Sequence, residues 1–125
     1  MNLCLFDLDH TLLPLDSDHE FGEFLIRQGL ADAVEYRQRN DGFYQQYCNG
    51  TLVLGEYIQF TTSIWREMDV AGQQALQQAF MDEVVFPAMK PQAIELVEHH
   101  RAMGDLIAIV TATNEFVTRP IADAF

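Results

Sequence analysis

The sequence has little of what would define several other classes of protein. No apolar run approaches the roughly 18 residues that a membrane-spanning helix needs. The first residues contain neither the basic region nor the cleavage site of a signal peptide. The only cysteines, Cys4 and Cys48, lack metal-ligand spacing and lie in apolar or aromatic stretches, where buried free thiols of a reducing compartment are expected. These absences predict a cytoplasmic protein that neither binds nor crosses a membrane.

Basic residues are also scarce. Lys and Arg together number 7 against 19 Asp and Glu, which gives a formal net charge of −12. A surface of this charge repels nucleic acid and anionic lipid, so neither is expected as a partner. It would also repel an anionic substrate unless a cation screened the site locally. The 125 residues are 49% hydrophobic, which is enough for the core of one domain or of part of one.

Apolar patterning predicts two strands among a set of helices. The runs MNLCLF at 1–6 and DLIAIV at 105–110 are typical of buried parallel strands covered on both faces. Residues 17–20 fit the capping box S-x-x-E before a helix, and Pro120 should bend the last helix or shift its start. The order is that of a βαβ layout whose four middle helices form an inserted lobe. Apolar residues at helical spacing predict helices at about 18–28, 32–48, 55–68, 70–85, 91–103 and from 115 onward.

Both predicted strands run into polar clusters, DLDHT at 7–11 and TATN at 111–114. In open parallel sheets, ligands bind beyond the carboxyl ends of the strands. Residues two apart in an extended chain point the same way, so Asp7 and Asp9 can share one crevice. There, one carboxylate could attack phosphorus while the other moves a proton. A hydroxyl and backbone N–H groups at the start of a helix, as at 111–114, favour phosphate binding.

These clusters carry a family resemblance. DLDHT after an apolar strand resembles motif I, D-x-D-x-[TV], of the haloacid dehalogenase-like (HAD) superfamily, and Thr111 resembles the hydroxyl of its motif II. The segment between Pro14 and Met89 is similar to the helical type-1 cap of that superfamily. LDSDHEFGEF and VTATNEFVTRPIA resemble the phosphoserine-phosphatase-like subgroup, in which some bacterial members are assigned as histidinol-phosphate phosphatases. The likeness extends over essentially all 125 residues.

The resemblance implies an α/β fold, namely a partial Rossmann-like HAD core with parallel strands near 2–7 and 105–111 and an inserted helical cap. Residues 1–14 and 90–125 would form the core, and residues 15–89 the cap. Members of the family also carry a motif III lysine and motif IV acidic residues, normally downstream of the last residue here. The only lysine is Lys90, before motif II. The sequence is therefore expected to be the N-terminal part of a longer HAD hydrolase.

The resemblance also implies an activity, the Mg²⁺-dependent hydrolysis of small phosphorylated metabolites through an aspartyl-phosphate intermediate. The enzyme would be similar to phosphoserine or histidinol-phosphate phosphatases. Asp7 would be the nucleophile and a Mg²⁺ ligand, and Asp9 would be the general acid/base, with its backbone carbonyl also on Mg²⁺. Three residues would bind the phosphoryl group: Thr111, Asn114 and Thr11. Three acidic residues of the cap would contact the substrate: Asp16, Asp18 and Glu20.

Other interpretations remain open beside this one. Thr111 could be a helix N-cap, with or without a role in phosphate binding. The chain could be a catalytically incomplete fragment that lacks the motif III lysine and the motif IV acids, weak or inactive alone. Such a fragment could pair with a second copy through an exposed sheet edge. A receiver-like phosphoacceptor module also has an acidic pair after its first strand, but the long helical insert argues against it.

Overall fold

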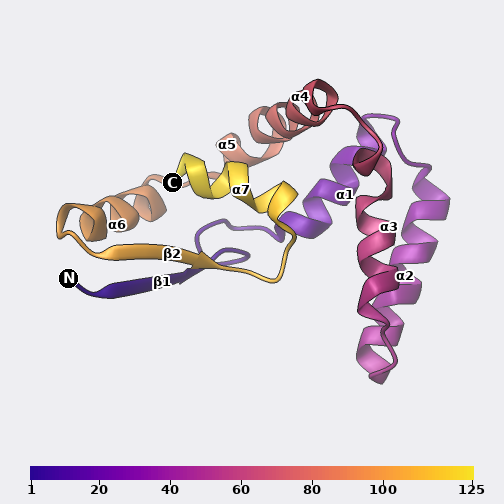
Figure 1. Cartoon of the computed structure of the whole chain (residues 1–125), viewed down its shortest axis with the longest axis horizontal. Helices are drawn as coiled ribbons and strands as arrows, with labels where there is room; N and C mark the ends of the chain where they lie inside the picture. The colour runs from indigo at the N-terminus through magenta and orange to yellow at the C-terminus, as the bar shows by residue number, and fades with distance from the viewer. The chain divides into compact units, whose positions relative to one another are not determined.

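The computed structural model describes all 125 residues, and Figure 1 shows the order of the helices and strands. The predicted α/β class, with strands near 2–7 and 105–111, is confirmed. None of the helices combines the length and the apolar character that crossing a membrane requires. The elements are β1 (Leu3–Asp7), α1 (Ser17–Arg27), α2 (Ala33–Asn49), α3 (Leu54–Arg66), α4 (Val70–Phe80), the π-helix η1 (Met81–Val85), α5 (Phe86–Ala88), α6 (Pro91–Ala102), β2 (Leu106–Val110) and α7 (Glu115–Ala124).

The two strands pair in parallel, from Leu3 opposite Leu106 to Asp7 opposite Val110. Their carboxyl ends therefore lie together, and α6 packs beside β2 (Figure 1). The expectation that both faces of the strands are buried is wrong. Leu3, Leu5 and Leu106 expose 62%, 59% and 58% of their surface, because side chains alternate across a strand and helices cover only one face. The predicted pairing of two copies through the sheet edge stays a prediction.

Residues 1–21 and 75–125 form one compact unit, which holds the sheet. Its core contains Leu8, Val85 and Ile121, each with no exposed surface. The rings of Phe21 and Phe80 meet edge to face with their centroids 5.1 Å apart, a favourable aromatic geometry. Full burial of a side chain such as Leu8 or Ile121 stabilises a fold by about 1.5–3 kcal/mol. The buried side chains therefore anchor the loops that leave the sheet.

Residues 22–74 form the second unit, in which α2 and α3 lie side by side (Figure 1). The Phe43 ring packs 5.2 Å from Phe60 and 5.5 Å from Tyr57, measured between centroids. No residue of α2 is buried, and Cys48 on this helix is exposed. The expected burial of Cys48 is therefore wrong. The unit boundaries fall at 21–22 and 74–75. The division into 1–14, 15–89 and 90–125 that the family resemblance implies stays a prediction.

The single helix expected over 70–85 is interrupted. After α4 the backbone widens into the π-helix η1, where the N–H of Phe86 donates to the carbonyl of Met81, five residues earlier. Pro87 follows directly, and a proline ring crowds the carbonyl four residues before it. A one-residue widening of the turn avoids that clash, and single π-turns of this kind are a common solution inside helices.

A polar cluster joins the end of α6 to the beginnings of both strands. Asp105 Oδ2 lies 2.9 Å from Nδ1 of His100, and Asp105 Oδ1 accepts the N–H of Asn2 at 3.0 Å. The side chain of Asp105 is only 4% exposed. The bond to His100, followed by the Asn2 N–H, lowers the pKa of Asp105 below its ordinary value of 3.8.

We expect this cluster to make stability depend on acid. Because the pKa of Asp105 is depressed in the folded state, its contribution is present above the unfolded-state pKa and disappears as the pH falls through the folded-state pKa. Asp105→Asn should lower the stability at neutral pH and flatten its acid dependence. Urea unfolding between about pH 2.5 and 7 measures this. The exposed Asp41→Asn is the control, and identical pH profiles for Asp105→Asn and the unchanged chain would contradict the assignment.

Candidate active site

The loop after β1 presents Asp7 at the end of the sheet. The backbone folds back at once, since Thr11 and Leu13 both donate N–H bonds to the carbonyl of Leu8, at 3.2 and 3.1 Å. Leu12 and Leu13 are buried beneath this turn. The carboxylate of Asp7 stays exposed, and its two oxygens accept the Leu8 N–H at 3.0 Å and the Thr11 hydroxyl at 3.1 Å. The turn therefore orients an accessible carboxylate.

Asp9 connects three segments of the chain. Its Oδ1 accepts the N–H of Ser17, the first residue of α1, at 2.8 Å. Its Oδ2 accepts the hydroxyl of Thr113, in the loop after β2, at 3.2 Å. A carboxylate is stabilised at a helix N-terminus because the unpaired N–H groups and the helix dipole both favour negative charge. Asp9 thereby holds the loops after β1 and β2 together, as the parallel pairing predicts.

The loop after β2 is ordered by its own threonines. The N–H of Thr113 donates to Oγ1 of Thr111 at 3.2 Å, and Oγ of Ser17 lies 3.3 Å from Oγ1 of Thr113. Asn114, not Thr111, caps α7, because Asn114 Oδ1 accepts the N–H of Val117 at 3.2 Å. Of the predicted phosphate-binding residues, Thr11 and Asn114 therefore lie in the loops that meet here, and Thr111 bonds to Thr113.

Sequence reasoning missed Thr113, whose hydroxyl donates to Asp9, and Ser17, whose backbone N–H donates to Asp9. The capping box predicted at residues 17–20 is wrong, because Ser17 is already the first residue of α1. Asp16 is the N-cap of α1 instead, since its Oδ1 accepts the N–H of His19 at 3.0 Å. A carboxylate beside the serine competes well for that position, and it leaves the fully buried Ser17 to face Thr113. The alternation of threonines at 111 and 113 was the available signal.

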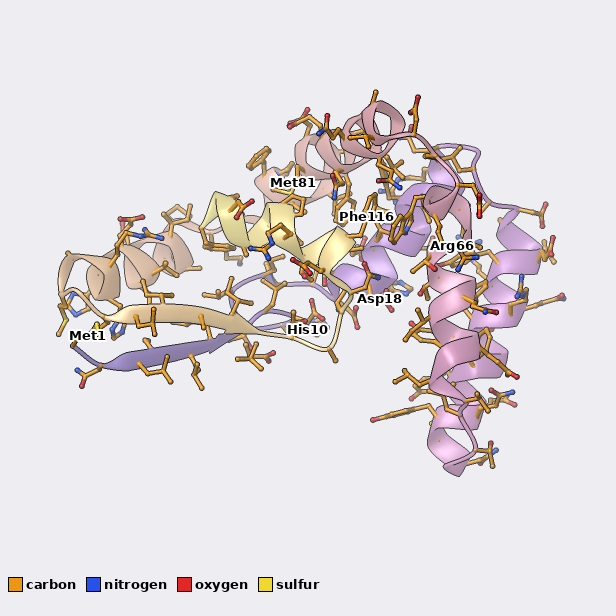
Figure 2. All side chains as sticks on the ribbon, in the orientation of Figure 1. Met1, His10, Asp18, Arg66, Met81 and Phe116 are labelled. Atoms are coloured by element: carbon orange, nitrogen blue, oxygen red, sulfur yellow. The ribbon has the colours of Figure 1, made fainter.

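Asp18 and Glu20 lie in the first turn of α1, the helix whose N-terminus meets Asp9. Figure 2 labels Asp18 there, and it labels His10 in the loop at the end of the sheet where both strands finish. Asp16 is occupied in capping the same helix. The three acidic residues assigned to the substrate thus surround the start of α1, and their role stays a prediction.

The donors to the two carboxylates are all neutral. They are the backbone N–H groups of Leu8 and Ser17 and the hydroxyls of Thr11 and Thr113. No group of three or more His, Cys, Asp or Glu side chains is placed to hold a metal ion. The carboxylate of Asp7 and the backbone carbonyl of Asp9 nevertheless fit Mg²⁺, because this ion takes carboxylate and carbonyl oxygens, keeps several water ligands and also binds substrate phosphate.

His10, directly after Asp9, has a left-handed backbone with φ of 54°. Residues with a Cβ rarely adopt this conformation, which costs roughly 1–2 kcal/mol in L-residues and is least unfavourable for short polar side chains. The N–H of His10 donates to the carbonyl of Leu15 at 3.0 Å, which closes the loop. Backbone strain of this kind often lies beside functional residues, where the surrounding contacts enforce it.

A family model described as haloacid dehalogenase-like hydrolase matches residues 4–125. The chain belongs to this family. The predicted resemblance to the HAD superfamily is thereby confirmed. The chain is also 35% identical over 124 residues to a protein named "Histidinol-phosphatase" from Neisseria meningitidis serogroup C (strain 8013), a match that covers 99% of this chain and 56% of that protein.

Two solved structures are similar to this HAD-family chain. One, from Bordetella pertussis Tohama I, is described as a protein with unknown function; it is 45% identical with a TM-score of 0.86, over 98% of this chain and 56% of the other. The second, a phosphoserine phosphohydrolase-like protein from Francisella tularensis subsp. tularensis SCHU S4, is 17% identical with a TM-score of 0.63, over 99% and 53%. At that identity it supports the fold alone. The chain spans about half the length of these relatives.

The strain at His10 gives a testable expectation. His10→Gly should raise the free energy of unfolding by about 0.5–1 kcal/mol, because glycine adopts a positive φ without the Cβ penalty. The matched control is His19→Gly, the same substitution inside α1, which should lower it by about 0.3–0.5 kcal/mol. Chemical denaturation of the three proteins decides the matter, and a loss of stability in both variants would contradict the strained backbone at His10.

The hydrogen bond from the Thr113 hydroxyl to Asp9 gives a second testable prediction. Thr113→Val removes the hydroxyl at nearly constant volume and leaves Asp9 without one of its two partners. The free energy of unfolding should fall by about 1–2 kcal/mol. Thr113→Ser keeps the hydroxyl and should recover most of that loss. Equal stability of the valine and serine variants in urea unfolding would show that the bond contributes nothing.

Proposed function

We propose that this protein hydrolyses phosphate monoesters of small metabolites, with Asp7 as the nucleophile. The observation that supports this most is the contrast between the two acidic residues. Asp7 is exposed and held by two donors, whereas Asp9 is half-buried and fixed between two loops. Family membership and the phosphatase name of the Neisseria relative support the same activity.

In the proposed reaction a carboxylate oxygen of Asp7 attacks phosphorus and the bond to the ester oxygen breaks, which leaves an aspartyl-phosphate and an alcohol. Asp9 donates the proton that the leaving oxygen needs. Water then attacks the aspartyl-phosphate, Asp9 takes up a proton from that water, and inorganic phosphate and free Asp7 are released. The bonds to Leu8 and Thr11 keep Asp7 oriented, so much of its positioning is in place before substrate binds.

The loop after β2 supplies groups for the phosphoryl oxygens. Because the Thr111 oxygen accepts the N–H of Thr113, the Thr111 hydroxyl proton can donate to a ligand. Asn114 uses its amide oxygen as the cap of α7 and keeps its amide N–H₂ as a donor. Thr11 lies on the opposite loop, beside Asp7. The N-terminus of α7 adds a partial positive charge that favours an anion.

The proposal includes Mg²⁺, which the carboxylate of Asp7 and the backbone carbonyl of Asp9 would hold, so that the Asp9 carboxylate stays free for proton transfer. When bound, the ion supplies the positive charge that the neutral donors of this site lack and stabilises charge on the transferring phosphoryl group. This also answers the electrostatic problem set by a net charge of −12, since a phosphate ester would otherwise meet two carboxyl groups and an acidic surface.

Asp16, Asp18 and Glu20 are the proposed contacts to the rest of the substrate. Their acidic side chains favour a metabolite that carries an ammonium or other cationic group beside its phosphate. The name of the Neisseria relative is consistent with this class, because histidinol phosphate bears an amine. A phosphorylated amino alcohol is therefore the first substrate to try.

The activity test uses a generic phosphomonoester and this amine-bearing substrate, with and without Mg²⁺. Asp7→Asn should lower kcat on the order of 10⁴-fold, and removal of Mg²⁺ with a chelator should abolish turnover until the ion is restored. Asp41→Asn, on the exposed surface of α2, is the matched control and should leave turnover unchanged. Turnover that survives in Asp7→Asn would contradict the assigned nucleophile.

A further inference from the structure

Helix α7 contains a proline, Pro120, in its middle. The helix nevertheless begins at Glu115 and runs through it, so the expected shift of the start does not occur. Proline has no N–H group, so the carbonyl of Phe116, four residues earlier, cannot receive its usual helical bond. The proline ring also crowds that carbonyl. The first turn of α7 therefore needs a donor from outside the helix.

Gln77, on α4, supplies this donor. Its side-chain Nε2 donates to the carbonyl oxygen of Phe116 at 2.9 Å. The bond is part-buried, and the crevice beside it has essentially no room for a water molecule while Gln77 is in place. A carbonyl left unpaired in such part-buried surroundings is destabilising, because it loses a hydrogen bond and regains only part of its hydration. The crevice is lined by Phe21, Gln77, Phe80, Met81, Phe116, Val117 and Pro120.

The bonded carbonyl lies close to the candidate phosphate loop. Phe116 is two residues after Asn114, the cap of α7, and Asn114 directly follows Thr113, which donates to Asp9. The aromatic ring of Phe116 also meets Phe21 of α1 with centroids 6.1 Å apart. The direction of the first turn of α7 thus decides where the donors of the loop after β2 point.

We propose that Gln77 is a positioning residue for phosphate binding. Its amide replaces the N–H that Pro120 lacks and so holds the first turn of α7, with Thr113 and Asn114, in the orientation that the site requires. The role in phosphate binding rests on the function proposed above, whereas the replacement of the missing N–H does not.

A double-mutant cycle tests the replacement directly. Pro120→Ala restores an N–H four residues after Phe116, so the helix can satisfy the carbonyl by itself. Gln77→Leu should raise the unfolding equilibrium constant about tenfold in the natural chain and less than about threefold in the Pro120→Ala background. Should Gln77→Leu alone fail to fold, the double variant should still fold. Equal effects in the two backgrounds would overturn the proposal.

The matched control is the next residue of the same helix. Gln78 is exposed and donates to Oδ1 of Asp82 at 2.9 Å, away from the crevice. Gln78→Leu removes a side-chain amide from the neighbouring position of α4. Its effect on the unfolding equilibrium constant should be the same whether residue 120 is proline or alanine. A dependence of the Gln78 variant on residue 120 would show that the cycle reports general stability of the helix, and would overturn the proposal.

The positioning role is measured on the same variants. Gln77→Leu should shift the amide NMR signals of Thr113 and Asn114 and weaken the binding of inorganic phosphate, in the presence of Mg²⁺, several-fold. Pro120→Ala should restore both. Unchanged amide signals, or unchanged phosphate affinity in a chain that does bind phosphate, would overturn this role. If no variant binds phosphate, the proposed function fails, and the unfolding cycle with the amide signals still decides the role of Gln77.

Discussion

The candidate site depends on the two hydrogen bonds that the carboxylate of Asp9 accepts. One oxygen accepts the first N–H of α1 and the other accepts the hydroxyl of Thr113, so a single side chain joins the loops that follow β1 and β2. Parallel pairing brings the ends of the strands together, but it does not by itself set the conformation of the loops. Asp9 does so, and it leaves the neighbouring carboxylate of Asp7 exposed. The acid that joins the two loops and the acid that stays exposed are thereby separated by one residue.

Two locally unfavourable features lie close to this edge of the sheet. His10 adopts a left-handed backbone, and Pro120 removes a hydrogen bond from α7. The N–H of His10 bonds to the carbonyl of Leu15 within the same loop, and the amide of Gln77, from α4, replaces the bond that α7 lacks. Local rules are thus broken where two loops must take specific shapes, and hydrogen bonds, one within the loop and one from α4, compensate for the cost. This pattern is common where a protein sacrifices local stability to shape a site.

Much of the fold and part of the site follow from the sequence, since apolar runs ending in DLDHT and TATN require two strand ends with polar loops. The exceptions have physical causes. The S-x-x-E pattern did not reveal that Asp16 would outcompete Ser17 as a cap, because both are good acceptors. Spacing could not tell which threonine turns toward Asp9, since the chain leaves its extended form after Val110. The bond of Gln77 joins residues 39 apart and has no local signal.

The pairing of β1 with β2 also constrains when the chain can fold. The backbone of Asn2 bonds to Asp105, a separation of 103 residues. At synthesis rates of about 5–20 residues per second, β1 leaves the ribosome roughly 5 to 20 s before its partner exists. Helices can form during that time, but the sheet cannot, and loop closure of this length slows its nucleation further. An apolar strand with an unpaired edge is prone to aggregation, so β1 is vulnerable until β2 emerges and pairs with one of its edges.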